Sequence, residues 1–315
     1  MDKLTRLVGA LSCAAVVAAA GCSANSSVTP ASGSPMQSAA VGHSASGWTT
    51  ENGVSYAKPI YMRTRNAPHP DVHPDTTFTY GNGALLYKPK LYLIFWGFGA
   101  AGDPNGMEPL LKKYAQSVGG TKYNAIYTQY TGTAGTIKNP KAQYGGFWND
   151  DTNPIAAHPS DGQVAAESLA GVAHFGYDPN GSYVVVTAHL HSSSGFGSSF
   201  CAYHSATSYQ SQLVSYTNLP YIPDAGQSCG SNIVTAPSDE TGADEGVTIV
   251  EGHEYGESIS DPNPPSGYYN GLYGEIGDIC AWTDIQNDKY RKHIFTAQPM
   301  WSNADDACVH SYKKK

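Results

Sequence analysis

Three residues of one predicted helix, His253, Glu254 and Glu257, have the types and the spacing to bind and use a metal ion. His253 and Glu257 are four residues apart and therefore lie on the same face of a helix. A cation held between them would lower the pKa of a water molecule beside it. Glu254 lies about 100° further round the helix, where its carboxylate could take the proton of that water. The residues predict metal-assisted hydrolysis, with His253 and Glu257 as ligands and Glu254 as the catalytic base.

The spacing is similar to the His-Glu-x-x-His motif of zinc peptidases, with Glu257 in the place of the second histidine. Such a catalytic site needs a third protein ligand. Glu275 follows Glu257 at a spacing similar to that in the gluzincin peptidases, where a glutamate on a following helix completes the site. The resemblance implies that Glu275 is the third metal ligand. Asp278, three residues later, could orient a ligand.

One histidine and two glutamates form a harder donor set than zinc usually takes in closed structural sites. A second nitrogen could come from His204, and less readily from His189 or His191. Asp261, directly before Pro262, is a further candidate to support or join the ligands. We expect one divalent metal ion, with zinc favoured and calcium or manganese credible if no second nitrogen joins.

The ends of the predicted helix are marked by its own residues. Asp244 and Glu245 suit a helix N-terminus, and Pro262 ends the helix because the residue before a proline is pushed out of helical geometry. Gly252 and Gly256 each cost roughly 1 kcal/mol in a helix interior. Two such residues in one stretch predict that a neighbouring backbone or a substrate strand comes close.

Strands and helices alternate along the chain before this helix. Apolar runs of strand length indicate buried strands, and apolar residues at helical spacing indicate helices. The alternation favours an α/β domain with a mixed central sheet flanked by helices, and an α+β fold is the alternative. One domain over 48–315 is long enough to bury a full core. The expected elements are strands over 91–96, 128–131 and 182–188 and helices over 107–118 and 161–173.

The amino terminus has the features of a secretory signal. Lys3 and Arg6 precede an apolar run, 7–20, that ends in small residues and is shorter than the ~20 residues that span a membrane. We expect 1–21 to be a signal peptide. Small residues leading into Cys22 resemble the lipobox of bacterial lipoproteins, which implies acylation of Cys22; an unmodified cysteine is the alternative. Residues 22–47, rich in Ser, Ala, Gly and Pro, would then be a flexible tether.

Cysteine usage agrees with export. The sequence contains six cysteines. If Cys13 leaves with the signal peptide and Cys22 is acylated, an even set of four remains, which in an oxidising compartment can form two disulfides in three pairings. Closeness in sequence favours Cys201 with Cys229 and Cys280 with Cys308.

Composition excludes some classes of function. Charged residues make up 14% of the chain and its formal net charge is −8, whereas a nucleic-acid-binding protein needs a basic face. No segment after the signal is apolar enough to span a membrane, so we expect contact with a membrane through the acyl anchor alone. We expect a monomer.

Five segments of the chain carry a resemblance to a known family. They are, in chain order, Leu91–Trp96 with Gly97, Val184–Thr187, Cys201–His204, His253–Glu257 with Asp261-Pro262, and Glu275 before Cys280. Together they resemble the EXORDIUM or phosphate-induced secreted protein family of plants and its bacterial relatives. The resemblance covers roughly 91–308, and it implies a secreted protein with a His-Glu-x-x-Glu helix followed by Asp or Asn and Pro. The acyl tether and the fewer cysteines around His204 depart from the plant pattern, so a role in growth signalling is not implied.

Two functions fit these residues. The first is an exported metal-dependent hydrolase, a zinc peptidase above all, acting on a peptide or an envelope polymer. The second is a non-catalytic module of the cell envelope that holds a structural ion and presents aromatic side chains to glycans or to a partner. The aromatic candidates are Trp48, Trp96, Trp148, Trp282 and Trp301.

Overall fold

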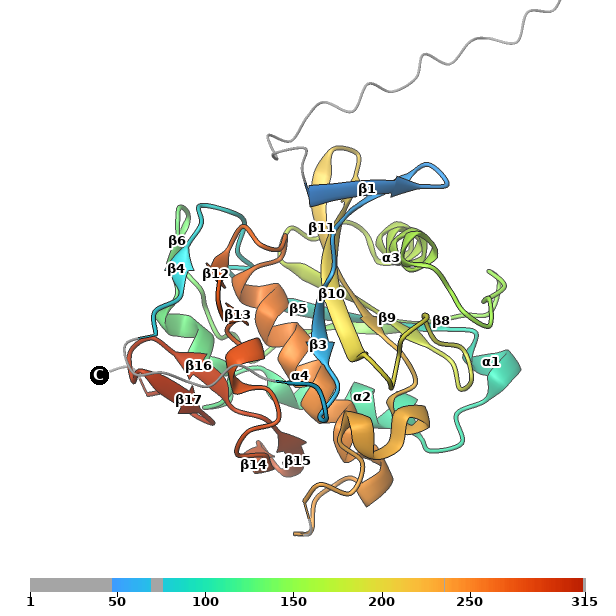
Figure 1. The fold of residues 1–315 in the computed structure, drawn as a ribbon. Helices are drawn as coiled ribbons and strands as arrows, with labels where there is room; N and C mark the ends of the chain where they lie inside the picture. Colours follow the sequence, from blue (N-terminus) through green and yellow to red (C-terminus); the bar gives the residue numbers. More distant parts are fainter. Residues whose placement is uncertain (1–46, 69–75, 235, 314–315) are drawn as a thin grey trace, which may run out of the picture. The chain divides into compact units, whose positions relative to one another are not determined.

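A mixed eight-stranded sheet runs through the part of the chain that the structure describes (Figure 1). The computed structural model describes residues 47–68, 76–234 and 236–313, which all belong to one compact unit. The predicted signal peptide, Cys22 and nearly all of the predicted tether lie outside these residues. In the sheet the strands follow the order β1-β2-β10-β11-β9-β5-β8, and β3 also pairs with β10. Their bounds are β1 Trp48–Glu51, β2 Val54–Ala57, β3 Ile60–Arg63, β5 Lys90–Trp96, β8 Tyr144–Asp150, β9 Gly181–Thr187, β10 Phe200–Tyr209 and β11 Gln212–Leu219.

The sheet is parallel in one half and antiparallel in the other. Strands β11, β9, β5 and β8 are parallel neighbours, whereas β10 pairs antiparallel with β11, β2 and β3. Helix α2 joins β5 to β8 and helix α3 joins β8 to β9, as parallel pairing requires. The predicted α/β class with a mixed central sheet is therefore confirmed. The helices are α1 Phe98–Ala101, α2 Met107–Val118, α3 Asp161–Phe175 and α4 Glu245–Ser260.

The alternation of side chains along β5 divides the core into two layers. Successive strand residues point to opposite faces of a sheet. Leu91, Leu93 and Phe95 pack with residues of α2 and α4, whereas Ile94 and Trp96 pack with residues of α3. Figure 1 shows α3 on one side of the sheet and α2 and α4 on the other. Helix α4 is therefore held inside the larger of the two cores.

The long periodic segments formed the elements that their sequences predict. The strands expected over 91–96 and 182–188 are β5 and β9, the helix expected over 107–118 is α2, and the helix expected over 161–173 is α3. A capping box fixes the start of α3, because the side chain of Ser160 accepts from the Gln163 amide and the side chain of Gln163 accepts from the Ser160 amide.

The strand predicted over 128–131 is wrong. A 3₁₀ helix, η2 (Asn124–Gln129), takes up most of this segment, and a two-residue strand begins only at Thr131. The side chains of Thr128 and Gln129 donate hydrogen bonds to the carbonyl groups three residues earlier. These local bonds stabilise a helical turn in place of a strand.

Short strands and 3₁₀ helices of the C-terminal third cover α4 on the side away from the sheet. The strand β15 packs directly on α4, and β13 and η5 lie next to each other. Their bounds and those of the other short elements are β4 Thr79–Tyr80, β6 Thr131–Gly132, β7 Gly135–Thr136, η3 Ile222–Cys229, η4 Gly242–Asp244, β12 Tyr268–Asn270, β13 Gly274–Glu275, η5 Asp278–Cys280, β14 Gln286–Tyr290, β15 His293–Ala297, β16 Met300–Ser302 and β17 Ala307–Val309.

Two disulfides form in the predicted pairing. Cys201 of β10 is bonded to Cys229 at the end of η3, and Cys280 of η5 is bonded to Cys308 of β17. Each joins residues 28 positions apart. Disulfides of this kind indicate an exported protein or another oxidising environment.

Among the described residues, no helix combines the length and the apolar character that crossing a bilayer requires.

Candidate metal centre

Helix α4 is buried along its whole length, from Glu245 to Ser260. Its first turn is anchored by Glu245, whose Oε2 accepts hydrogen bonds from the amides of Ile233 and Val234. The helix ends where the Asp261 amide donates to the Glu257 carbonyl, directly before Pro262. His253, Glu254 and Glu257 are each 0% exposed. The predicted helix therefore brings its three chemical residues into the interior.

The two glycines of α4 make room for side chains of the covering layer. A Cβ at Gly256 would lie 2.3 Å from the Tyr127 hydroxyl and 2.6 Å from Cε of Met300, and one at Gly252 would lie 3.2 Å from the Tyr114 hydroxyl. The prediction of a close approach is confirmed. The predicted partner, a backbone or a substrate strand, is wrong, because tyrosine and methionine side chains occupy the space.

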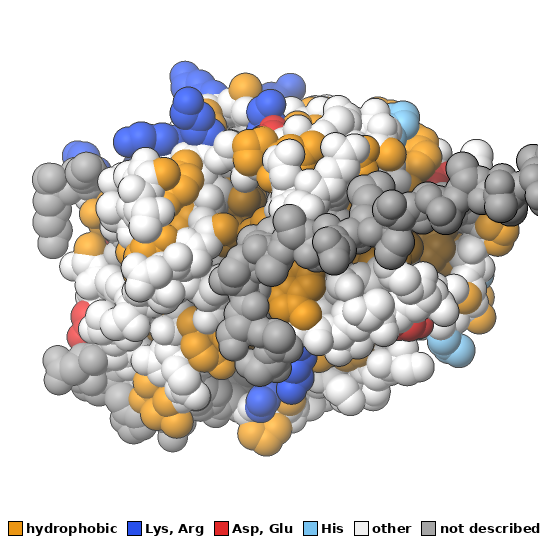
Figure 2. Space-filling model, turned by 90° about the horizontal axis from the view of Figure 1, so that it is seen from above, with side chains coloured by type: hydrophobic (Ala, Val, Ile, Leu, Met, Phe, Trp, Pro, Cys, Tyr) orange, Lys and Arg blue, Asp and Glu red, His pale blue; other side chains and the backbone are white. Residues whose placement is uncertain are grey.

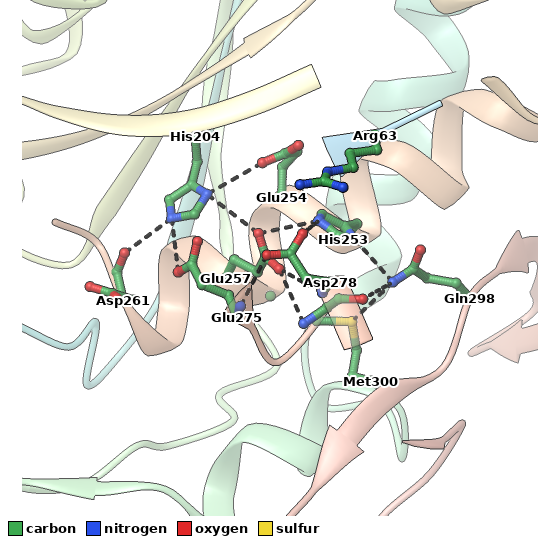
Figure 3. A network of polar contacts seen from close by, with 12 residues as sticks. Arg63, His204, His253, Glu254, Glu257, Asp261, Glu275, Asp278, Gln298 and Met300 are labelled. Atoms are coloured by element: carbon green, nitrogen blue, oxygen red, sulfur yellow. Dashed lines mark hydrogen bonds and ion pairs between the residues drawn. The ribbon is translucent and has the colours of Figure 1, made fainter. Parts of the chain in front are cut away.

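His204 of β10 enters the same interior from the sheet (Figure 3). Its Nδ1 lies 3.3 Å from Oε2 of Glu254 and 3.5 Å from Oε2 of Glu257. On the other side of the ring, Nε2 lies 3.3 Å from Oε1 of Glu275 and 3.1 Å from the carbonyl oxygen of Asp261. Both groups near Nε2 are acceptors, so Nε2 carries the proton of the neutral ring and Nδ1 keeps its lone pair.

His253 faces the carboxylates with its Nε2 atom. That atom lies 3.2 Å from Oε2 of Glu257 and 3.7 Å from Oδ1 of Asp278. The other ring nitrogen, Nδ1, lies 3.0 Å from the side-chain amide of Gln298. Gln298 thereby holds the ring with Nε2 facing the carboxylates.

Glu257 is oriented by the backbone of the following loop. Its Oε1 accepts hydrogen bonds from the amides of Gly277 and Asp278, at 3.1 and 3.0 Å, which leaves Oε2 pointing toward both histidines. Gly277 is needed for this approach, because a Cβ there would lie 2.7 Å from Oε1 of Glu257 and 2.9 Å from Nδ1 of His253. The side chain of Glu257 therefore has one fixed oxygen and one available oxygen.

The buried atoms that converge here have no hydrogen-bond partner among the described residues. These atoms are Nδ1 of His204, Nε2 of His253, Oε2 of Glu257, and both carboxylate oxygens of Glu254. An unsatisfied buried polar atom costs about 1–3 kcal/mol, and several at one place indicate that a cation belongs between them. Two groups of three side chains have donor atoms within 4.8 Å of one another, His204 with Glu254 and Glu257, and His253 with Glu257 and Asp278. The residues present therefore fit a divalent metal ion.

The protonation behaviour of these groups leads to the same inference. Burial raises the pKa of Glu257 to about 7, against the opposing charge of His204. Burial also raises the pKa of Glu254 and of Glu275. Burial lowers the pKa of His204, but the neighbouring carboxylates of Glu275, Glu254 and Glu257 together outweigh it, so the pKa lies well above its usual value. Without a cation the cluster must take up protons, and a divalent ion can take their place.

The structure places Glu275 differently from the prediction. Glu275 lies on the short strand β13, not on a helix, and contacts Nε2 of His204. Asp278 is the third donor beside His253 and Glu257. The reason is local: Gly274 adopts a positive φ of 80°, and the segment after α4 turns back as the hairpin β12–β13, so no second helix can form there.

Asp261, His189 and His191 stay outside both donor groups. Asp261 offers His204 its backbone carbonyl, while its Oδ1 accepts from the amides of Ser266 and Gly267. His189 pairs with Asp224 at 2.6 Å, and Nδ1 of His191 lies 2.9 Å from a backbone carbonyl. The second nitrogen of the cluster is therefore that of His204.

A groove of about 850 Å³ reaches the centre from the surface. Its lining includes Tyr61, Arg63, Tyr269 and Tyr273, and of the five candidate donors it includes Asp278. The side chain of Asp278 is 19% exposed, whereas those of His204 and His253 are 0% exposed. A separate hollow of about 370 Å³ contains none of the donors. The groove therefore approaches the centre at the group that contains Asp278.

The surface is less acidic than the net charge suggests. On the face drawn in Figure 2, few Asp and Glu side chains are visible, and Lys and Arg lie mainly at the upper edge, with a further group at the lower centre. Nine Asp and Glu residues of the described chain are buried, and four of them belong to α4. The formal charge of −8 therefore reflects carboxylates of the interior as well as those of the surface.

Comparisons of the chain with family models, curated proteins and solved structures found no match. The resemblance to the EXORDIUM family stays a prediction that rests on the sequence motifs. Function is therefore argued from the donor atoms and the groove alone.

Proposed function

We propose that this protein is an exported metal-dependent hydrolase whose reaction centre lies at the inner end of the groove. One observation carries the proposal: Nε2 of His253 and Oε2 of Glu257 are buried without partners and converge with Asp278, which itself lines the groove. Hydrolysis requires both a cation site and a route for substrate, and Asp278 belongs to both.

A divalent cation held by His253, Glu257 and Asp278 would polarise a carbonyl group and bring the pKa of water toward neutrality. Glu254 serves as the base in this proposal. Its carboxylate is buried without a hydrogen-bond partner, and burial raises its pKa toward the range in which a general base works near neutral pH. Two imidazoles in the cluster favour zinc, with manganese and calcium as alternatives.

The groove suggests the class of substrate. Three tyrosine side chains offer flat apolar surface, and Arg63 and Lys58 add positive charge. These walls suit an extended chain with apolar and anionic groups, so we favour a peptide, followed by another envelope polymer. Residues 1–21 as a signal peptide and an acylated Cys22 would place the enzyme at the cell envelope.

One observation favours the second candidate, a non-catalytic module with a structural ion. His204, His253, Glu254 and Glu257 are 0% exposed, so a metal there has little contact with water. The predicted aromatic surface gains less support, because Trp96 and Trp301 are buried in two different core layers.

The experiment that tests the proposal uses purified protein that has been stripped with a chelator and reloaded with Zn²⁺. We expect cleavage of a fluorescence-quenched peptide library that requires the metal and is lost in His253→Ala. The matched control is His189→Ala, a histidine outside the cluster, which should keep full activity. Metal-loaded protein that cleaves neither the library nor envelope glycopeptides, while chelation lowers its melting temperature, would establish the binding module instead.

A further inference from the structure

The centre has more donors than one ion needs. Five buried or nearly buried side chains form two groups of three that share Glu257, and no group contains both histidines. His204 and Glu254 belong to the first group, which we call the inner group. His253 and Asp278 belong to the second, the outer group, which meets the groove.

The distances within each group are those between ligands of one ion. Two ligands on a tetrahedral ion, each ~2.1 Å from it, are about 3.4 Å apart. In the inner group, Nδ1 of His204 lies 3.3 and 3.5 Å from the oxygens of Glu254 and Glu257. In the outer group, Nε2 of His253 lies 3.2 and 3.7 Å from the oxygens of Glu257 and Asp278.

The lone pair of His204 is the independent sign of an inner ligand. Its ring is 0% exposed, and Nδ1 has no hydrogen-bond partner among the described residues. The proton of the neutral ring belongs on Nε2, between Glu275 and the carbonyl of Asp261. Nδ1 faces two carboxylates that cannot donate to it, so a proton or a metal cation must lie between them, and the spacing of the three side chains fits a metal cation.

The charge of the carboxyl groups also fits two ions. Glu254, Glu257, Glu275 and Asp278 lie around the two histidines. When all four are ionised they carry four negative charges, which two divalent cations balance, whereas with one divalent cation two of the groups must hold protons.

We propose that the centre binds two divalent metal ions, one in the inner and one in the outer group, with Oε2 of Glu257 shared between them. Oε1 of Glu257 is held by two backbone amides, so the sharing uses Oε2 alone. Glu254 supplies Oε2 to the inner ion, and its Oε1 is left for the proton of water. This inference extends the proposed function, because the catalytic role of the outer ion rests on the hydrolase proposal. Two-metal centres recur in hydrolases.

The test is the number of metal ions per chain, measured by elemental analysis and native mass spectrometry on Zn²⁺-loaded protein. We expect two ions in the wild type, one in His204→Ala and one in Asp278→Ala, and two in the control His189→Ala. Circular dichroism checks that each variant is folded, and Glu254→Gln replaces His204→Ala if that variant does not fold. With Mn²⁺ in place of Zn²⁺, electron paramagnetic resonance should show a spin-coupled pair in the wild type and isolated ions in the variants.

The outcomes separate this inference from the proposed function. One ion per chain that is lost in His253→Ala but kept in His204→Ala overturns the second ion and leaves the hydrolase proposal standing. Two ions without any hydrolysis overturn the hydrolase proposal and support the two-ion centre. Protein that binds no metal overturns both.

Discussion

Oε1 of Glu275 lies 3.3 Å from Nε2 of His204, on the side of the ring that faces away from Glu254 and Glu257. Glu275 therefore contacts the outer nitrogen of His204 and does not join His253 in a donor group. A carboxylate that accepts the outer proton of an imidazole fixes its tautomer and makes the inner nitrogen a better ligand. This relationship gives Glu275 and His204 roles that their positions in the sequence do not reveal.

Replacing Glu275 by Ala should weaken the binding of the metal ion at His204 while the ligands of that ion stay in place. Loss of such an outer partner typically lowers metal affinity about 10–100-fold. Competition with a chelating dye would measure this change. Glu275→Gln, whose side-chain oxygen can still accept a hydrogen bond from His204, should recover part of the lost metal affinity. Affinity equal to the wild type would contradict the positioning role, and loss of the metal at saturating concentration would show that Glu275 is itself a ligand.

Glu254→Gln should slow the reaction while the outer metal ion stays bound. The amide cannot accept a proton from water, so we expect kcat to fall about 10²–10⁴-fold, while the ion bound by His253 and Asp278 remains. Steady-state kinetics combined with elemental analysis of the same sample checks both parts. A fully active variant would exclude Glu254 as the base.

The two disulfides should contribute equally to stability but unequally to metal binding. Both close a loop of 28 positions, for which loop entropy predicts about 3–4 kcal/mol each. Removing Cys280–Cys308 should also weaken the metal, because Asp278 lies on the three-residue helix that this disulfide holds. His204 lies in the ten-residue strand β10, paired on both sides, so removing Cys201–Cys229 should affect the metal less.

Denaturant unfolding and metal titration of the two Cys→Ala double variants would test this expectation. The larger loss of metal affinity in the variant that lacks Cys201–Cys229 would contradict it.

The sequence was sufficient where the deciding interactions are local. The strands β5 and β9 coincide with continuous apolar runs of the sequence, and the helix α2 coincides with apolar residues at helical spacing. The folded protein retains all three elements. The His-Glu-x-x-Glu spacing belongs to one helix, so His253 and Glu257 meet on one face whatever surrounds them. The close cysteine pairs could be predicted for the same reason.

The sequence was insufficient where contacts join distant segments. His204 meets α4 because β10 pairs with both β3 and β11 in the sheet, which no spacing reveals. Gln298 follows β15 in a stretch without a motif, and Gly277 matters only because Glu257 and His253 crowd against it. The position of Glu275 was carried over from a helical arrangement that the hairpin β12–β13 excludes.

Glu167 of α3, a buried carboxyl group outside α4, should make the free energy of unfolding depend on pH. Burial, aided by the charge of Asp150, raises the pKa of Glu167 to about 8, whereas an unfolded Glu titrates near ~4.3. Between these values the folded state binds more protons than the unfolded state, so stability falls as pH rises through the window. Glu167→Gln keeps the neutral shape and removes this loss.

The melting temperature of Glu167→Gln relative to the wild type should therefore increase from pH 5 to pH 8.5. The control is Glu108→Gln, which changes a partly exposed glutamate that is paired with Lys112. A difference between Glu167→Gln and the wild type that does not change with pH would contradict the raised pKa.

The carboxylate of Glu257 belongs to both donor groups. Its removal is the most direct test of the metal centre. Elemental analysis should compare the wild type with Glu257→Gln and with Glu251→Gln, a buried carboxyl of the same helix that lies outside both donor groups. We expect the metal content to fall to background in Glu257→Gln and to stay at the wild-type level in Glu251→Gln. Equal metal in all three proteins would contradict a metal centre built on Glu257.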